Sequence, residues 1–172
     1  VFYFPKFFHP DPTVVRQSGF LTPSINHSNI LGSSFTLPYF YEISENKDFT
    51  IKPSWFDSDI LSFQNEYRKT NKNSELVADF GLVKGFKSSS SNKRKNLNHF
   101  FVNYNYDLEL DEFISSNLSL NLEKTNNDTY LKIFDPHITK STVRPESFNI
   151  LKNNLEINLN HEDYNFTTGI IA

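Results

Sequence analysis

The sequence predicts an all-β fold, an antiparallel up-and-down meander of about nine strands. Apolar and polar residues alternate with a period of two over segments of about ten residues, the pattern of strands with one apolar and one polar face. Helical periodicity is nearly absent, and no stretch approaches the roughly 18 to 20 apolar residues of a membrane helix. Aromatic residues make up 16% of the chain, although apolar residues together reach only 37%. Large side chains are therefore spread along alternating segments.

The first half of the chain has the clearest alternation. In residues 34–43, Phe35, Tyr39 and Ile43 alternate with residues such as Ser34 and Thr36. Polar turns at 44–47, 57–59 and 70–74 separate this segment from the next ones. The first five predicted strands span residues 19–26, 34–43, 48–55, 61–68 and 76–82.

The second half has longer strands and longer connections. Residues 84–96 form a predicted loop rich in Ser and Lys, and residues 124–147 form a long irregular stretch. The last four predicted strands span residues 99–110, 117–123, 151–160 and 164–170. We expect no helix longer than a turn or two.

The connections fall into two sets that alternate along the chain. One set is short, at 44–47, 70–74, 111–113 and 162–163, and the other contains both long loops. Outer-membrane barrels have this asymmetry, with short periplasmic turns and long outer loops. The pattern therefore favours a partial outer-membrane transmembrane β-barrel, about nine strands of a larger barrel.

A soluble, aromatic-rich β-sandwich of the glycan-binding kind is the alternative, because it shows the same alternation. The two architectures differ in what covers the apolar face: a sandwich buries it against a second sheet, whereas a barrel presents it to lipid. In the barrel, one convex surface carries Phe35, Leu37, Tyr39, Ile51, Phe63, Leu76, Phe80, Val102, Tyr104, Leu118, Leu120, Leu155 and Ile157. The concave side is lined by Ser62, Gln64, Glu66, Asn103, Asn121 and Asn158.

Other function classes have little support. A net charge of −3 does not indicate a nucleic-acid binder, and the absence of cysteine excludes thiolate chemistry from this segment. His9 with Asp11, or His161 with Glu162 and Asp163, lacks the spacing of a metal site. The sequence also has no glycine-rich phosphate loop and no Gly-x-Ser-x-Gly elbow. We expect no catalysis, cofactor or metal.

A series of short motifs resembles the LptD family of outer-membrane lipopolysaccharide (LPS) assembly proteins in order and spacing. The motifs are Tyr3-Phe4-Pro5, His9-Pro10-Asp11-Pro12, Arg16-Gln17-Ser18-Gly19-Phe20-Leu21-Thr22-Pro23, Leu37-Pro38-Tyr39-Phe40-Tyr41, Asn46-Lys47-Asp48, Ile51-Lys52-Pro53, Glu66-Tyr67-Arg68 and Asp128-Thr129-Tyr130-Leu131. No single motif is specific, but the ordered set is. Between residues 84 and 127 the sequence shares only the alternating strand pattern of a barrel with the family, and no motif.

The resemblance implies a domain organisation and partners. Residues 1–18 would end a periplasmic β-jellyroll, and residues 19–172 would be the N-terminal part of the barrel. The implied location is the cell outer membrane of a Gram-negative bacterium, with LPS as the cargo. The lipoprotein LptE would occupy the lumen, and the periplasmic bridge protein LptA would dock on the jellyroll. Both ends of the chain fall within strand-like patterns, so we expect further sequence on either side.

Pro23 and Pro38 are the candidate functional residues. Prolines usually mark turns or edges, but Pro38 lies in the middle of an alternating segment, where it removes a ladder hydrogen bond. Members of the family have prolines at both points. The resemblance therefore implies a lateral gate, with the first strand as an open edge that pairs with the last strand of the barrel.

A basic run is the second candidate site. Lys84, Lys87, Lys93, Arg94 and Lys95 occur together with no acidic residue among them. A solvated, flexible loop is one interpretation. Contact with the anionic phosphates of LPS is the other.

Overall fold

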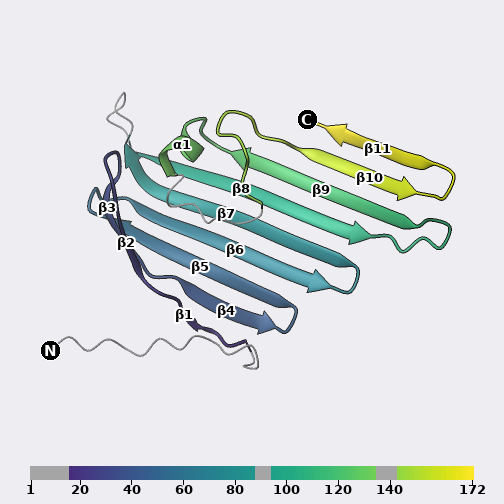
Figure 1. Cartoon of the computed structure of the whole chain (residues 1–172). Coiled ribbons are helices and arrows are strands. Elements are labelled where there is room, and N and C mark those ends of the chain that lie inside the picture. Colours follow the sequence, from purple (N-terminus) through teal and green to yellow (C-terminus); the bar gives the residue numbers. More distant parts are fainter. Residues whose placement is uncertain (1–15, 88–93, 135–142) are drawn as a thin grey trace.

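The computed structural model describes residues 16–87, 94–134 and 143–172. All of its strands belong to one antiparallel sheet (Figure 1). The strands are β1 (Gly19–Phe20), β2 (Ser24–Ser28), β3 (Gly32–Thr36), β4 (Tyr39–Ser44), β5 (Lys47–Phe56), β6 (Leu61–Asn71), β7 (Ser74–Lys87), β8 (Arg94–Asp107), β9 (Ser115–Thr125), β10 (Asn154–Asn160) and β11 (Asn165–Ile171). From β4 to β11 each strand pairs with the next along the chain. The predicted meander is confirmed.

The structure has eleven strands where the sequence predicted about nine, because the first two predicted strands are each divided. The first becomes β1 and β2, and the second becomes β3 and β4. β1 pairs with β4 and β2 with β3, while β3 and β4 both pair with β5. The two breaks contain Pro23 and Pro38. Each pair of segments therefore follows the course of one long, interrupted strand.

The strand register sorts the side chains as predicted. One face, called the open face here, carries Phe35 beside Trp55, Tyr39 beside Ile51, and Val102 beside Leu122. The opposite face, called the polar face, carries Ser62, Gln64, Glu66, Asn103, Asn121 and Asn158. Since the described strands form a single sheet, the apolar face meets no second sheet of this chain. The β-sandwich alternative is therefore unsupported.

The two ends of the sheet differ as the sequence predicted. The turns from β4 to β5, β6 to β7, β8 to β9 and β10 to β11 lie at one end, called the short-turn end here. The opposite, long-connection end has the 126–153 connection, which contains the one helix of the described residues, α1 (Tyr130–Phe134). This helix lies beside β7 and β8 (Figure 1). Nowhere in the described ranges is a helix long and apolar enough to cross a membrane.

An apolar cluster lies under α1 on the polar face, toward the long-connection end. Tyr130, Leu131 and Phe134 of the helix are buried there with Val83 and Phe101 of the sheet. Burial of large apolar side chains on one end of an otherwise polar face fixes the helix at this place, at about 25 cal/mol for each Å² removed from water. Sequence periodicity alone did not indicate this small core.

The sequence predicted a loop at residues 84–96 that is longer than the connection in the structure. β7 continues to Lys87 and β8 begins at Arg94. A bulge at Gly85, whose φ is +85°, shifts the register between Val83 and Phe86 and hides the period-2 pattern. The motifs at residues 1–15, which make up most of the predicted jellyroll end at residues 1–18, lie outside the described residues, as does Lys93.

Candidate functional site

The edge of the sheet at β1 and β2 has an interrupted hydrogen-bond ladder. β1 pairs with β4 over two residue pairs, and β2 pairs with β3 over five. The register moves by one residue between the two ladders, and the Leu21 N–H donates to the Pro38 carbonyl oxygen at 2.9 Å in the gap. Ile25 of β2 is 80% exposed. In the described part of the chain, the outer side of this edge has no paired strand.

A third proline extends the gap into the sheet. The Leu37 N–H donates to the Pro53 carbonyl oxygen at 3.2 Å, but a proline nitrogen carries no hydrogen to return the bond. Pro53 lies within β5, opposite Phe63 of β6. Pro23 and Pro38 lie in the breaks of the first two long strands and Pro53 lies in the third, so each of these three neighbouring strands lacks one backbone donor in this band.

A buried carboxylate clamps the beginning of the edge. Asp48 of β5 accepts hydrogen bonds from Arg16 Nη2 at 2.6 Å and from Arg68 Nε at 2.8 Å. The Arg16 guanidinium also lies over the Phe40 ring, 5.4 Å from its centre. Only 5% of the Asp48 side chain is exposed, whereas both arginines are about half exposed. This clamp of Arg16, Asp48 and Arg68 fixes the segment before β1 on the polar face.

The other end of the edge hairpin is also anchored. The turn between β2 and β3 buries Leu31 in the cluster under α1. Asp57 accepts a hydrogen bond from the Ser33 N–H at 3.0 Å, and Ser58 Oγ donates to the Leu31 carbonyl oxygen at 2.7 Å. Gly32 adopts φ +80°, and a Cβ there would overlap the Asp57 carboxylate. The edge is thus held at both ends and interrupted between them.

A buried chain of polar groups joins α1 to the sheet. Tyr130 Oη lies 2.7 Å from His99 Nδ1, and His99 Nε2 lies 2.9 Å from Asp79 Oδ1. Gln64 Nε2 donates to the same Tyr130 oxygen at 3.2 Å. We call Gln64, Asp79, His99 and Tyr130 the latch. All four residues are at least 97% buried.

The local sequence makes room for the latch. Gln64, Gly81 and His99 lie side by side on β6, β7 and β8. A Cβ on Gly81 would collide with the His99 ring and lie 2.7 Å from Gln64 Oε1, so the glycine leaves the space in which both side chains meet Tyr130. The ring of Phe101 stacks on His99 with 4.5 Å between centroids.

The electrostatics of the latch favour one pattern of donors. Burial raises the pKa of the Tyr130 hydroxyl, which therefore remains a protonated donor. If His99 Nε2–H donates to the Asp79 carboxylate, Nδ1 is left to accept from Tyr130. Gln64 Oε1 is buried without a hydrogen-bond partner among the described residues. This pattern positions a helix, and it lacks the exposed nucleophile or pocket of a catalytic site.

The basic residues lie at the long-connection end of the sheet. Lys87 and Arg94 are directly paired across β7 and β8, and Lys95 is opposite Phe86. Lys84, Lys87, Arg94 and Lys95 are exposed. Arg94 Nη2 forms an exposed ion pair with Asp59 Oδ2 at 3.1 Å, so this run has an acidic neighbour that the sequence did not indicate.

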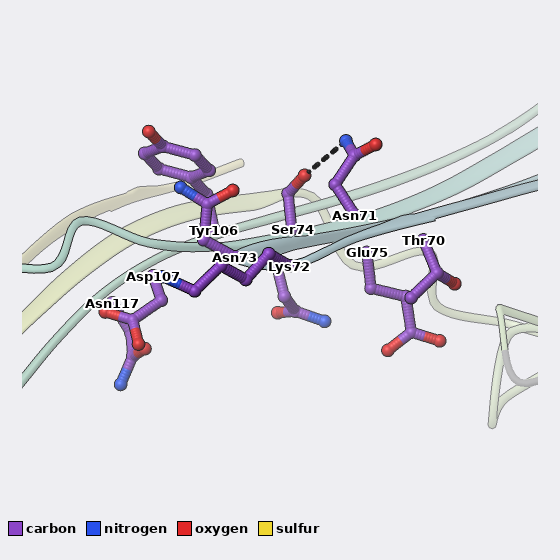
Figure 2. Close-up of a pocket in the computed structure, with 10 residues that line it drawn as sticks. Thr70, Asn71, Lys72, Asn73, Ser74, Glu75, Tyr106, Asp107 and Asn117 are labelled. Carbon is purple, nitrogen blue, oxygen red and sulfur yellow. Dashed lines mark hydrogen bonds between the residues drawn. The ribbon is translucent and has the colours of Figure 1, made fainter. Parts of the chain in front are cut away.

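A shallow hollow of about 300 Å³ lies at the short-turn end, around the turn from β6 to β7. Figure 2 shows Tyr106 and Asn71 on one side of this turn and Glu75 and Asn117 on the other. Asn71 Nδ2 donates to Ser74 Oγ at 2.9 Å. Because the lining side chains diverge, the hollow has no convergent set of chemical groups.

Sequence reasoning singled out Pro23 and Pro38, whose role as a gate stays a prediction, and it did not indicate the clamp or the latch. Arg16, Asp48 and Arg68 each lay in a family-like motif, yet nothing in one sequence showed that they meet. Gly81, in the middle of a strand, was the available signal for the latch, since such glycines often mark a close approach of another group. Tyr130 was noted only as part of the Asp128–Leu131 motif.

The strand pattern and the divided faces define the class of protein. An open antiparallel sheet of long strands, with an exposed apolar face and a polar opposite face, is a portion of a β-barrel of the outer-membrane type. No protein-family model matches the chain.

Several curated LptD proteins are similar to this chain. LPS-assembly protein LptD of Cupriavidus necator is 28% identical over 131 residues, which are 75% of this chain and 15% of that protein. LptD of a Polaromonas species is 25% identical over 145 residues, 82% of this chain and 17% of that protein. LptD of Yersinia enterocolitica is 42% identical over 53 residues, 31% of this chain and 7% of that protein. The chain is similar to LptD proteins over most of its length and spans less than a fifth of the length of these relatives.

Proposed function

We propose that this chain forms the gate-side part of an outer-membrane β-barrel that inserts LPS into the outer leaflet. The relatives are named for LPS assembly, which makes LPS transport the function at the level of the family. In this proposal the open face contacts lipid and the polar face lines the lumen. The role requires no catalysis, only a route from a polar interior to a lipid phase.

The observation that carries the proposal is the interrupted edge. LPS has a large polar saccharide and apolar acyl chains, so a lateral exit must open between two strands. Pro23 and Pro38 lie where the ladders β1–β4 and β2–β3 are separated. Each missing hydrogen bond is worth about 0.5–1.5 kcal/mol, enough to bias where a seam opens. The anchors at Asp48 and Leu31 would confine that opening to the middle of the edge.

The basic residues would contact the lipid headgroups in this arrangement. Lys84, Lys87, Arg94 and Lys95 lie at the long-connection end, which the barrel assignment places outside the cell. Lysine and arginine recognise phosphate by charge and by hydrogen bonding. We include Lys93 in the proposed contact by its sequence position alone.

The proposed partners follow from the family. LptE would lie against the polar face in the lumen, and LptA would dock on a periplasmic jellyroll to which residues 1–18 would connect. Residues 19–172 would then be the N-terminal part of the barrel in the outer membrane. The glycan-binding sandwich has no observation in its favour.

A double substitution tests the gate. In the full-length protein, Pro23→Ala with Pro38→Ala should restore strand pairing and slow the appearance of new LPS at the cell surface, at unchanged barrel abundance. Pro145→Ala is a control outside the strands. Unchanged LPS export and outer-membrane integrity at normal protein levels would show that these two prolines do not form a gate.

A further inference from the structure

The helix α1 is held on the polar face by contacts of two kinds. Phe134 meets the Phe86 ring edge-on at 5.9 Å, and Tyr130 stacks on Phe134 at 5.2 Å. Beside these apolar contacts, the Tyr130 hydroxyl makes hydrogen bonds to His99 and Gln64. A five-residue helix is too short to be stable alone, so its position depends on these contacts.

The hydrogen bonds between Tyr130 and the sheet are suited to reversible docking of α1. Gln64, Asp79 and His99 all project from strands of the sheet onto the polar face. If α1 moved away, water could replace Tyr130 as the partner of His99 and Gln64, because all three sheet groups are polar. The strand ladders of β6, β7 and β8 do not involve α1 and would remain paired. Release of the helix would therefore leave the sheet paired, but it would expose the apolar cluster around Val83 and Phe101.

The chain leading into α1 is tied to the sheet independently of the latch. Asn126 Oδ1 accepts from the Asn98 N–H at 2.8 Å, and Asn126 Nδ2 donates to the Asn96 carbonyl oxygen at 3.1 Å. Asn127 Oδ1 accepts from the Thr129 N–H at 3.0 Å just before the helix. The two bonds of Asn126 to β8 would keep the base of the connection in place while α1 moves.

We infer that Tyr130 is the latch residue of a detachable cover, formed by α1 over the long-connection end of the polar face. Gln64, His99 and Asp79 are the positioning residues that hold Tyr130 in the closed state. This inference rests on the proposed function, because the cover closes the outer end of the polar interior through which LPS would pass. Asp79 acts through His99: its carboxylate holds the ring so that Nδ1 faces Tyr130.

The first test removes the hydroxyl alone. Tyr130→Phe keeps the ring contacts with Phe134 and deletes both hydrogen bonds of the latch. A Leu131→Cys reporter, at a position 3% exposed in the closed state, measures release by its reaction with an impermeant maleimide on intact cells. This chain has no cysteine of its own, and the same protein without the reporter gives the background. Tyr106→Phe, on the open face of β8, is the matched control.

We expect Tyr130→Phe to raise the labelling rate of the reporter about tenfold, which corresponds to about 1.4 kcal/mol at 25 °C. Tyr106→Phe should leave the rate unchanged. Asp79→Asn should raise labelling as well, and combining it with Tyr130→Phe should add little, because both act on one chain of contacts. Barrel abundance should be normal in each variant, and large antibiotics should cross the outer membrane more readily in Tyr130→Phe.

Two results would overturn the inference. Unchanged labelling in Tyr130→Phe would show that the hydroxyl does not hold the cover. A fall in barrel abundance would show that α1 is an integral part of the folded sheet. Neither labelling nor barrel abundance depends on LPS export. The two tests are therefore independent: the proline variant can refute the gate without refuting the latch, and the Tyr130 variant can refute the latch without refuting the gate.

Discussion

The clamp at Asp48 makes a prediction whose size follows from the structure. Asp48→Asn keeps the shape of the side chain but removes its charge and one of its two acceptor oxygens. Hydrogen bonds to charged groups contribute about 1.5–3 kcal/mol each, and Asp48 receives two, from Arg16 and Arg68. Both arginines are about half exposed and regain water when released, which reduces the loss. We therefore expect about 1–2 kcal/mol of destabilisation.

The assay is urea unfolding of the full-length protein in detergent, with proteolysis of the segment around Arg16 measured in parallel. Arg94→Gln is the control, since its ion pair with Asp59 is exposed on both sides and should contribute well under about 1 kcal/mol. Asp48→Asn should lower the unfolding midpoint and expose the segment before β1 to protease. If Asp48→Asn behaves like Arg94→Gln in both measurements, the clamp does not anchor the edge.

Three further predictions concern other parts of the sheet. Gly32→Ala should destabilise the protein by about 1–3 kcal/mol in the same urea assay, because its left-handed φ disfavours a side chain; wild-type stability would contradict this. Gly81→Ala should displace His99 and increase labelling of the α1 reporter, and an unchanged rate would refute the glycine's role in the latch. Lys84→Gln with Lys87→Gln should weaken the salt-sensitive binding of the detergent-solubilised protein to LPS vesicles. Equal binding by the double variant and the wild-type protein would count against a contact between these lysines and phosphate.

Period-2 alternation was sufficient to predict the architecture, because residues such as Phe63 and Gln64 must lie on opposite faces of any strand that contains them. The same rule gave the two faces and, through the spacing of polar segments, the two kinds of connection. It could not predict the division of the first strands, which depends on how Pro38 sits against its neighbours. The period-2 rule also failed to predict the end of β7, because one extra residue at the Gly85 bulge reverses the alternation of side chains.

The candidate site was only partly accessible to sequence reasoning. Prolines are visible because their backbone chemistry is the same in every context, so Pro23 and Pro38 could be singled out directly. The latch instead depends on long-range geometry: Gln64 and Tyr130 are 66 residues apart, and α1 lacks enough length for a periodic signal. The clamp likewise depends on a contact between residues far apart in the sequence, because Arg16 and Asp48 are separated by 32 positions.

In the proposed function, LPS moves along the polar face and leaves through the interrupted edge. Photo-crosslinking during a pulse of newly made LPS tests this route most directly, with probes at Asn105 on the polar face, Leu21 in the proline gap and Phe100 on the open face. We predict early adducts at Asn105 and Leu21 that disappear during the chase, and only late adducts at Phe100. Adducts at Phe100 without any at Asn105 or Leu21 would contradict this route for LPS.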